Sequence, residues 1–333
     1  MTNKKLIISV IALSTALSGC GSADNATPMP VSIVSPASVA NTASPTMAAS
    51  IETVTSIPAR QGSEAGSHTG QIYKDITYCT MGGIALKLDL YFPQSMSAPA
   101  PVVVYVHGGG WTQGSRNGQV EMLYASALPE AGFILASVDY RLAPQHKFPA
   151  MIEDVKCAIR FLRARAAEYN IDPERIGAMG ASAGGHLVSL LGVSDGSAGF
   201  DMGEYLDQSS RVQAVVDLFG PADLTAGYSS AYQGMAQNVF GTTDPAHPVF
   251  MAASPVTYIT PDDPPFLILH GDRDQTVPLA QSQELYDKLI AGGVDAQLVI
   301  VRGGSHGLTD PDAVPCLEEL INLTLQFLKE NLS

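Results

Sequence analysis

The sequence is poor in charge, in cysteine and in tryptophan. Only 15% of its 333 residues are charged, and 32 acidic residues outnumber 18 basic ones. This acidity argues against a nucleic-acid partner, because phosphate binding requires clustered basic side chains. A hydrophobic content of 46% is sufficient for one large buried core plus an appendage.

The four cysteines do not have the spacing of metal ligands, so no metal site is expected. Cys157 lies in a predicted helix over residues 149–167, and it points away from an apolar face made by Ile152, Val155, Ile159, Leu162 and Ala166. This pattern predicts a solvent-facing cysteine. It could form a disulfide with Cys79 or Cys316, which would leave the third of these cysteines as an odd thiol. Alternatively, Cys79, Cys157 and Cys316 could all be free.

The first 19 residues have the pattern of an export signal. Lys4 and Lys5 precede an apolar run from Leu6 to Leu17 that is too short to span a membrane. The sequence Leu-Ser-Gly-Cys that ends at Cys20 resembles a bacterial lipobox, which implies a lipidated Cys20 as the mature N-terminus. The alternative is an ordinary signal peptide with a chance cysteine.

Residues 20–70 are rich in Ser, Ala, Thr and Pro and lack a helical or strand period, which predicts a tether to a folded domain over 71–333. A helical lid made from this segment is the alternative. Removing the two signal lysines changes the net charge from −14 to −16. We expect an extracytoplasmic protein anchored to a bacterial membrane by lipid, in the outer membrane if the host is Gram-negative, because Gly21 and not Asp follows the cysteine.

The domain alternates apolar runs with helical patterns. A hairpin is predicted around Gly82 and Gly83, and buried strands are predicted at PVVVYVHG, FILASVDY, RIGAMGAS, VQAVVDLFG, FLILHG and AQLVIV. Near-continuous Val, Ile and Leu runs separated by helices favour a mostly parallel sheet covered on both faces, which is an α/β fold.

One serine lies among small residues where a predicted strand meets a predicted helix. Gly180-Ala181-Ser182-Ala183-Gly184 fits the G-x-S-x-G pattern of a nucleophile elbow. The turn is so tight that a side chain at 180 or 184 would strike the strand or the helix. Ser182 is therefore the candidate nucleophile.

A second glycine motif, His107-Gly108-Gly109-Gly110-Trp111, follows an earlier strand. Its amides could face a cavity and form an oxyanion hole, with Gly109 and Gly110 as donors joined by Ala183. A flexible glycine turn is the alternative. His107 is interpreted as a brace for this loop.

The carboxylate and the base are expected after the serine, in that order. Asp272 and Asp274 follow one strand, and His306 follows the next, in a glycine-rich loop. His306 is the candidate base. His186 is interpreted as a packing residue, and His146, His247 and His270 are weaker alternatives to the base.

Six motifs in order, HGGGW, DYRLAP…FPA, GASAGGH, LFGPADL, ASPVTYI…DDPPFLILHGDRDQTVP and GGSHG, together resemble the hormone-sensitive-lipase-like branch of α/β-hydrolase esterases. The likeness is strongest to bacterial bifunctional feruloyl and acetyl-xylan esterases, and it covers about residues 71–331. It implies an eight-stranded sheet and a serine carboxylesterase without metal or organic cofactor. The implied triad is Ser182, Asp274 and His306, and the HGxxD spacing selects Asp274 over Asp272.

The sequence departs from many lipase-like relatives because a tether stands where they carry an N-terminal helical cap. An open site is therefore expected, and Trp111 would suit a sugar or aryl ester. The segment around 220–250 could form a small lid lined by Tyr228, Tyr232, Met235 and Phe240, or it could be ordinary packing. Asp139, Arg141 and Asp154 are expected in one structural ion-pair network.

The sequence leaves the acyl and alcohol groups of the substrate open, because a short-chain lipid ester or an aryl formamide also fits. Two other functions are alternatives. A serine peptidase of the prolyl-oligopeptidase type is disfavoured because the chain has no room for a propeller. A tethered binding module without catalysis is disfavoured because every triad position is filled.

Overall fold

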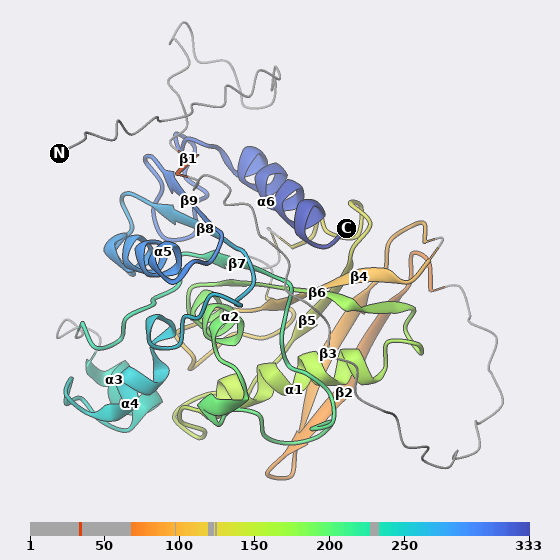
Figure 1. The fold of residues 1–333 in the computed structure, drawn as a ribbon, viewed down its shortest axis with the longest axis horizontal. Helices are drawn as coiled ribbons and strands as arrows, with labels where there is room; N and C mark the ends of the chain where they lie inside the picture. The colour runs from red at the N-terminus through yellow and green to blue at the C-terminus, as the bar shows by residue number, and fades with distance from the viewer. Residues whose placement is uncertain (1–32, 35–67, 97, 119–122, 124, 227–232) are drawn as a thin grey trace, which may run out of the picture.

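The apolar runs form the centre of the fold as strands of one sheet. The computed structural model describes residues 33–34, 68–96, 98–118, 123, 125–226 and 233–333. Within them the sheet order is β1-β9-β8-β7-β6-β4-β5-β3-β2 (Figure 1). The main strands are β2 (Ile72–Met81), β3 (Ile84–Tyr91), β4 (Ala100–Val106), β5 (Ile134–Val138), β6 (Ile171–Ala181), β7 (Ala214–Leu218), β8 (Phe266–Gly271) and β9 (Ala296–Val301).

The mostly parallel character of the sheet is confirmed. Strands β4 to β9 pair in parallel, whereas β2 and β3 form the predicted antiparallel hairpin at the edge. Gly82 and Gly83 make its turn with φ values of +59° and +84°, a combination that favours glycine. Strands β2 to β9 thus account for the eight-stranded sheet that the family resemblance implies.

A short ninth strand was not expected from the sequence. β1 (Ile33–Val34) lies inside the predicted tether and pairs antiparallel with Leu298 and Val299 of β9. Its pairing covers part of the outer edge of β9, which has no other strand partner on that side among the described residues. Apart from β1 and residues 68–70, the tether and the position of any N-terminal cap lie outside the described residues.

Helices cover both faces of the sheet. They are α1 (Ala150–Ala164), α2 (Ala183–Val193), α3 (Gln233–Phe240), α4 (Pro248–Ala253), α5 (Ala280–Gly292) and α6 (Leu317–Asn331), with short 3₁₀ turns at Gly196–Ala198 and Pro255–Thr257. In Figure 1, α1 and α2 lie below the sheet and α6 lies above it. None of the described helices combines the length and the apolar character that crossing a membrane would require.

Two apolar cores result from the alternation of side chains along each strand. On β4, Val102, Val104 and Val106 belong to the core under α1 and α2, whereas Val103 and Tyr105 belong to the core under α6. Because both faces are covered, the strand is apolar almost throughout, which is why its sequence showed no polar alternation.

The environment of Cys157 differs from the prediction. Its side chain is fully buried, because the hairpin and the loop at 200–206 cover the face of α1 that the helical pattern assigns to solvent. Cys157 forms a disulfide with Cys79 of β2. No described cysteine is a free thiol, so the odd thiol considered from the sequence is absent from this part of the chain.

The single ion-pair network expected around Asp139 and Arg141 is wrong in one respect. Arg141 does pair with Asp154, whose carboxylate also accepts its backbone N–H at 2.8 Å. Asp139 instead pairs with Arg116, which also binds Asp89 at 2.9 Å. There are thus two networks: one joins Arg141 to Asp154 and Glu153 of α1, and the other joins Asp139 to Arg116.

Removing the disulfide tests its contribution to stability. The Cys79→Ala, Cys157→Ala double variant should lower the free energy of unfolding by about 2–5 kcal/mol, because the bridge closes a long loop in the unfolded chain. Its two cysteines are 78 positions apart. Denaturant unfolding measures the loss; a variant as stable as wild type would show that the bridge does not stabilise the fold.

Candidate active site

Ser182 lies in the sharp turn between β6 and α2, as predicted. Its φ of +56° and ψ of −117° are strained values for a residue with a side chain. The turn is held because the Ser182 N–H donates to the carbonyl oxygen of Leu218 in β7 at 2.8 Å. The hydroxyl therefore projects from a fixed backbone at the carboxyl edge of the sheet.

The two glycines of the motif are required by close backbone contacts. A Cβ on Gly180 would lie 2.3 Å from the carbonyl oxygen of Gly184, at the start of α2. A Cβ on Gly184 would lie 2.0 Å from the carbonyl oxygen of Val106, at the end of β4. The second contact brings the glycine loop that follows β4 directly beside the serine.

The glycine loop is an ordered turn. Gly109 and Gly110 have φ values of +103° and +59°, and the carbonyl of Gly109 accepts the N–H groups of Thr112 and Gln113 at 3.1 Å. Gly109, Gly110 and Ala183 all line the same cavity as Ser182. Within the described chain, no residue accepts a hydrogen bond from these three amides, so they remain able to bind an oxyanion.

His107 braces this loop, in agreement with the interpretation from sequence. Its ring is buried and stacks on Tyr140 with centroids 4.3 Å apart. The Tyr140 hydroxyl donates to the His107 carbonyl at 3.0 Å. Burial lowers the pKa of His107, which keeps its ring neutral.

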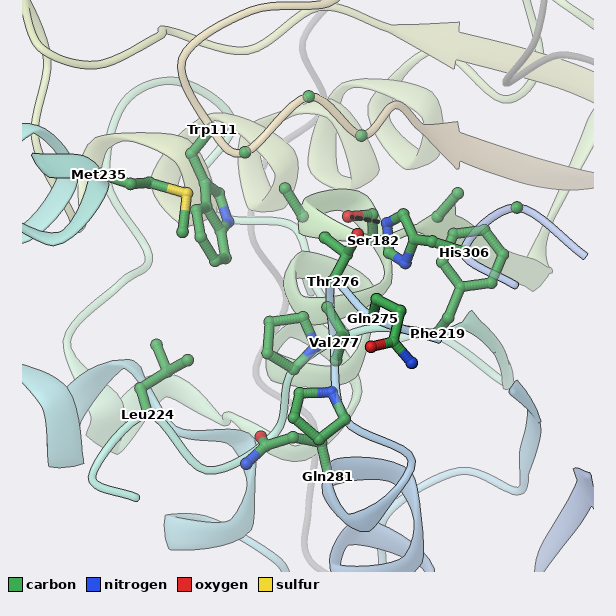
Figure 2. A pocket seen from close by; sticks show the side chains of 18 of the residues that line it. Trp111, Ser182, Phe219, Leu224, Met235, Gln275, Thr276, Val277, Gln281 and His306 are labelled. Atoms are coloured by element: carbon green, nitrogen blue, oxygen red, sulfur yellow. Dashed lines mark hydrogen bonds between the residues drawn. The ribbon is translucent and has the colours of Figure 1, made fainter. Parts of the chain in front are cut away.

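Ser182, His306 and Asp274 come together from three loops. Figure 2 shows Ser182 and His306 joined by a hydrogen bond. The Nε2 atom of His306 is 3.0 Å from the Ser182 hydroxyl, and its Nδ1 atom is 2.7 Å from Oδ2 of Asp274. A carboxylate accepts hydrogen bonds, so Nδ1 carries the proton and Nε2 is left to accept one from the serine. Such a line of groups can activate a hydroxyl as a nucleophile.

Asp274 is ionised despite its burial. Burial alone would raise its pKa, but hydrogen bonds from His270, His306 and the Val277 N–H outweigh that effect and hold the pKa well below its usual range. Asp272, by contrast, accepts the Gly303 N–H at 2.7 Å. The structure therefore places Asp274 beside His306 and Asp272 beside Gly303, which is the arrangement that the spacing predicts.

Two residues that the sequence analysis did not single out also hold His306. Asp310 accepts the Ser305 N–H at 2.7 Å and thereby closes the loop before the histidine. Phe219, directly after β7, packs edge-to-face on the imidazole with ring centroids 4.7 Å apart. The position of Phe219 after a strand of the catalytic edge was the only signal for it in the sequence.

His186 is a packing residue, but it also has a defined polar role. Its Nε2 atom is 2.7 Å from the Ala253 carbonyl, so that nitrogen carries the proton, and Nδ1 accepts the indole N–H of Trp111 at 3.2 Å. Burial lowers the pKa of His186 to about 4. This neutral tautomer fixes Trp111 at the wall of the cavity.

The site opens into a cavity of about 860 Å³. Trp111, Leu224 and Met235 line one side of it, and Gln281 lies at its far end from His306 (Figure 2). Met235 thus lines the site as expected, whereas Phe240 packs between Trp111 and Phe250 in the core. Tyr228 and Tyr232 lie outside the described residues.

Among the described residues, no group of three His, Cys, Asp or Glu side chains is arranged to hold a metal ion.

The BD-FAE family matches residues 88–289, which span β3 to α5 and include Ser182 and Asp274. The chain belongs to the BD-FAE family. This result confirms its resemblance to hormone-sensitive-lipase-like α/β-hydrolase esterases. The probable carboxylic ester hydrolase LipM of Mycobacterium tuberculosis is 35% identical over 223 residues, which are 65% of this chain and 51% of LipM.

Solved structures agree with the family. A truncated carbohydrate esterase from gut microbiota is 30% identical with a TM-score of 0.69, over 80% of this chain and 98% of that one. Butyrate-bound esterase Est2 of Thermogutta terrifontis is 27% identical with a TM-score of 0.64, over 77% of this chain and 93% of that one. The chain spans about half the length of the curated relatives it matches first.

The Gly184 contact with β4 is testable by adding one methyl group. Gly184→Ala should lower hydrolysis of 4-nitrophenyl acetate by at least about 100-fold, because the clash displaces both the elbow and the glycine loop. Gly234→Ala in α3 is the matched control, since nothing lies within 4 Å of its Cβ position. Comparable rates in the two variants would show that the close approach is not needed.

Proposed function

We propose that this BD-FAE family member is a serine carboxylesterase that works through an acyl-enzyme intermediate. One observation carries the proposal: the Ser182, His306 and Asp274 side chains form a continuous hydrogen-bonded line at a cavity that is also lined by the amides of Gly109, Gly110 and Ala183. The named relatives, which are esterases, support the same reaction class.

In acylation, Ser182 Oγ attacks the ester carbonyl carbon while its proton passes to Nε2 of His306. The carbonyl oxygen becomes an oxyanion that accepts hydrogen bonds from Gly109, Gly110 and Ala183. The tetrahedral intermediate then expels the alkoxide, which takes the proton from His306 and leaves as an alcohol. Ser182 now carries the acyl group.

Deacylation repeats these steps with water. Water gives a proton to Nε2 of His306 as its oxygen attacks the acyl carbon, and the intermediate collapses to free acid and a serine that regains the proton. Asp274 stays ionised throughout. Its low pKa keeps a negative charge 2.7 Å from Nδ1 of the imidazolium that forms in both halves of the reaction.

For the substrate we propose an acetyl or feruloyl ester of a carbohydrate. Trp111 adds an aromatic wall to the cavity, while Asp223 and Gln281 add polar atoms suited to hydroxyl groups. The cavity of about 860 Å³ has room for a bulky group on either side of the ester. Two structural relatives described as a carbohydrate esterase and as a bifunctional GH43-CE favour this class.

A substrate panel tests the proposal. The purified domain is assayed on acetyl-xylan, methyl ferulate, 4-nitrophenyl esters of increasing chain length, and dipeptidyl 4-nitroanilides. We expect turnover of short esters and of at least one sugar or feruloyl ester, with none of the anilides. Cleavage of anilides alone would favour a peptidase, and no turnover of any ester would favour a binding module.

Asp274 and Asp272 provide a matched pair for the proposed role of the acid. Asp274→Asn should lower kcat on one activated ester by on the order of 10²–10⁴, because the imidazole loses the tautomer that faces Ser182. Asp272→Asn removes a charge but keeps an oxygen that can accept the Gly303 N–H, so it should cost about 10-fold or less. Circular dichroism confirms the fold of both. A larger loss at Asp272 would transfer the role to it.

We further propose that Cys20 is lipidated and anchors the domain outside the cytoplasm, in the outer membrane if the host is Gram-negative. The support is the sequence Leu-Ser-Gly-Cys directly after the apolar signal run. Residues 20–70 would then separate the anchored cysteine from the catalytic domain.

Fractionation of cells that express the full chain tests the anchor. Cys20→Ser should move the protein from the membrane pellet to the soluble fraction, because no thiol remains to carry lipid. Ser18→Ala is the control, since it preserves a small residue before the cysteine and should remain in the pellet. A Cys20→Ser protein that still pellets would rule out lipidation as the anchor.

A further inference from the structure

A second histidine contacts the carboxylate that pairs with His306. His270 is the penultimate residue of β8 and is fully buried. Its Nε2 atom is 3.3 Å from Oδ2 of Asp274, the same oxygen that accepts the bond from His306. The proposed function assigns no role to it.

The neighbours of His270 identify its proton. Nε2 is 2.8 Å from the carbonyl oxygen of Val277, which can only accept, so Nε2 carries a hydrogen that faces both Val277 and Asp274. Nδ1 is 2.7 Å from the hydroxyl of buried Ser282 in α5, which can donate to it. A neutral ring thus satisfies both of its nitrogens.

The same turn holds the other oxygen of the carboxylate. Oδ1 of Asp274 accepts the N–H groups of Thr276 at 2.7 Å and Val277 at 2.9 Å. His270 therefore donates a hydrogen bond to the carbonyl oxygen of Val277, and the N–H of Val277 donates one to Asp274. These contacts connect β8, the acid turn and α5 around one carboxylate.

One other charged group faces His270, from β7. Asp217 is buried and close enough to interact electrostatically with the ring, but its two oxygens accept the Gly220 N–H at 2.8 Å and the Ser189 hydroxyl at 3.0 Å. Burial raises the pKa of Asp217 to about 6. The described hydrogen bonds of His270 thus go to the acid turn and to Ser282, not to Asp217.

We infer that His270 is a positioning residue for the esterase reaction: it holds the Asp274 carboxylate and the 274–277 turn so that Oδ2 stays directed at His306. This inference rests on the proposed function, because it assigns Asp274 to the triad. The hydrogen bond between Asp274 and His306 should depend on His270, and this dependence can be tested without turnover.

Three variants separate this role from a general effect on folding. His270→Leu removes both nitrogens, whereas His270→Gln retains an amide that can donate from the Nε2 position and an oxygen that can accept from Ser282. His186→Leu is the control. It removes another fully buried histidine that bonds a carbonyl and a side chain but has no contact with Asp274.

Kinetics provide the first measurement. His270→Leu should lower kcat by about 10- to 100-fold with little change in KM. The reason is that displacing the Asp274 carboxylate by a fraction of an ångström weakens stabilisation of the transition state but leaves substrate binding intact. In the pH profile of kcat/KM, the acid limb of His270→Leu should move to lower pH by about half a unit, since a loosely held Asp274 carboxylate stabilises the His306 imidazolium less. His270→Gln should remain within about threefold of wild type, and His186→Leu should leave the acid limb in place.

Proton NMR provides the second measurement, on protein without substrate. The Nδ1 proton of His306, strongly deshielded by Asp274 and assigned by its loss in Asp274→Asn, should broaden or vanish in His270→Leu and persist in His270→Gln and His186→Leu. A sharp, unmoved proton together with an unmoved acid limb in His270→Leu would overturn the inference. If wild type hydrolyses no ester, the proposed function fails, and the NMR comparison still decides whether His270 positions Asp274.

Discussion

The close approach of α2 to the end of β4 is the constraint on which the site depends. Gly184 leaves space for the Val106 carbonyl oxygen, which would lie only 2.0 Å from a side-chain carbon at that position. Because β4 continues into His107 and the glycine loop, this one contact sets the amides of Gly109 and Gly110 beside Ser182. The strained φ of Ser182 is tolerated because β6, β7 and α2 hold the backbone on both sides of it.

Around that constraint, buried polar groups are satisfied by partners that also fix orientation. Asp274 accepts hydrogen bonds from two backbone N–H groups and two histidines, so it remains charged where burial opposes charge. His186 is neutral in one tautomer because a carbonyl and an indole N–H determine which nitrogen is protonated. Orientation of this kind costs little at the moment of reaction, because the groups are already in place.

The catalytic geometry could be predicted from sequence where it depends on local backbone. Gly180 and Gly184 around Ser182, the glycines after β4, and the order serine, carboxylate, histidine are all properties of short segments whose strands end at one edge of a parallel sheet. The burial of Cys157, the pairing of Asp139 with Arg116, and the contacts of Phe219 and His270 were not predicted. Each depends on which distant element covers a surface, and helical or strand periodicity in one segment contains no information about its neighbour.

Covalent labelling tests the central claim, that Ser182 is a nucleophile activated by His306, most directly. The native protein is treated with a fluorophosphonate, digested, and its adduct is mapped by mass spectrometry. The account predicts a single stoichiometric adduct on Ser182 that fails to form at a comparable rate in His306→Ala. An adduct on another serine, such as Ser115 or Ser305, or equal labelling in the His306→Ala protein, would contradict it.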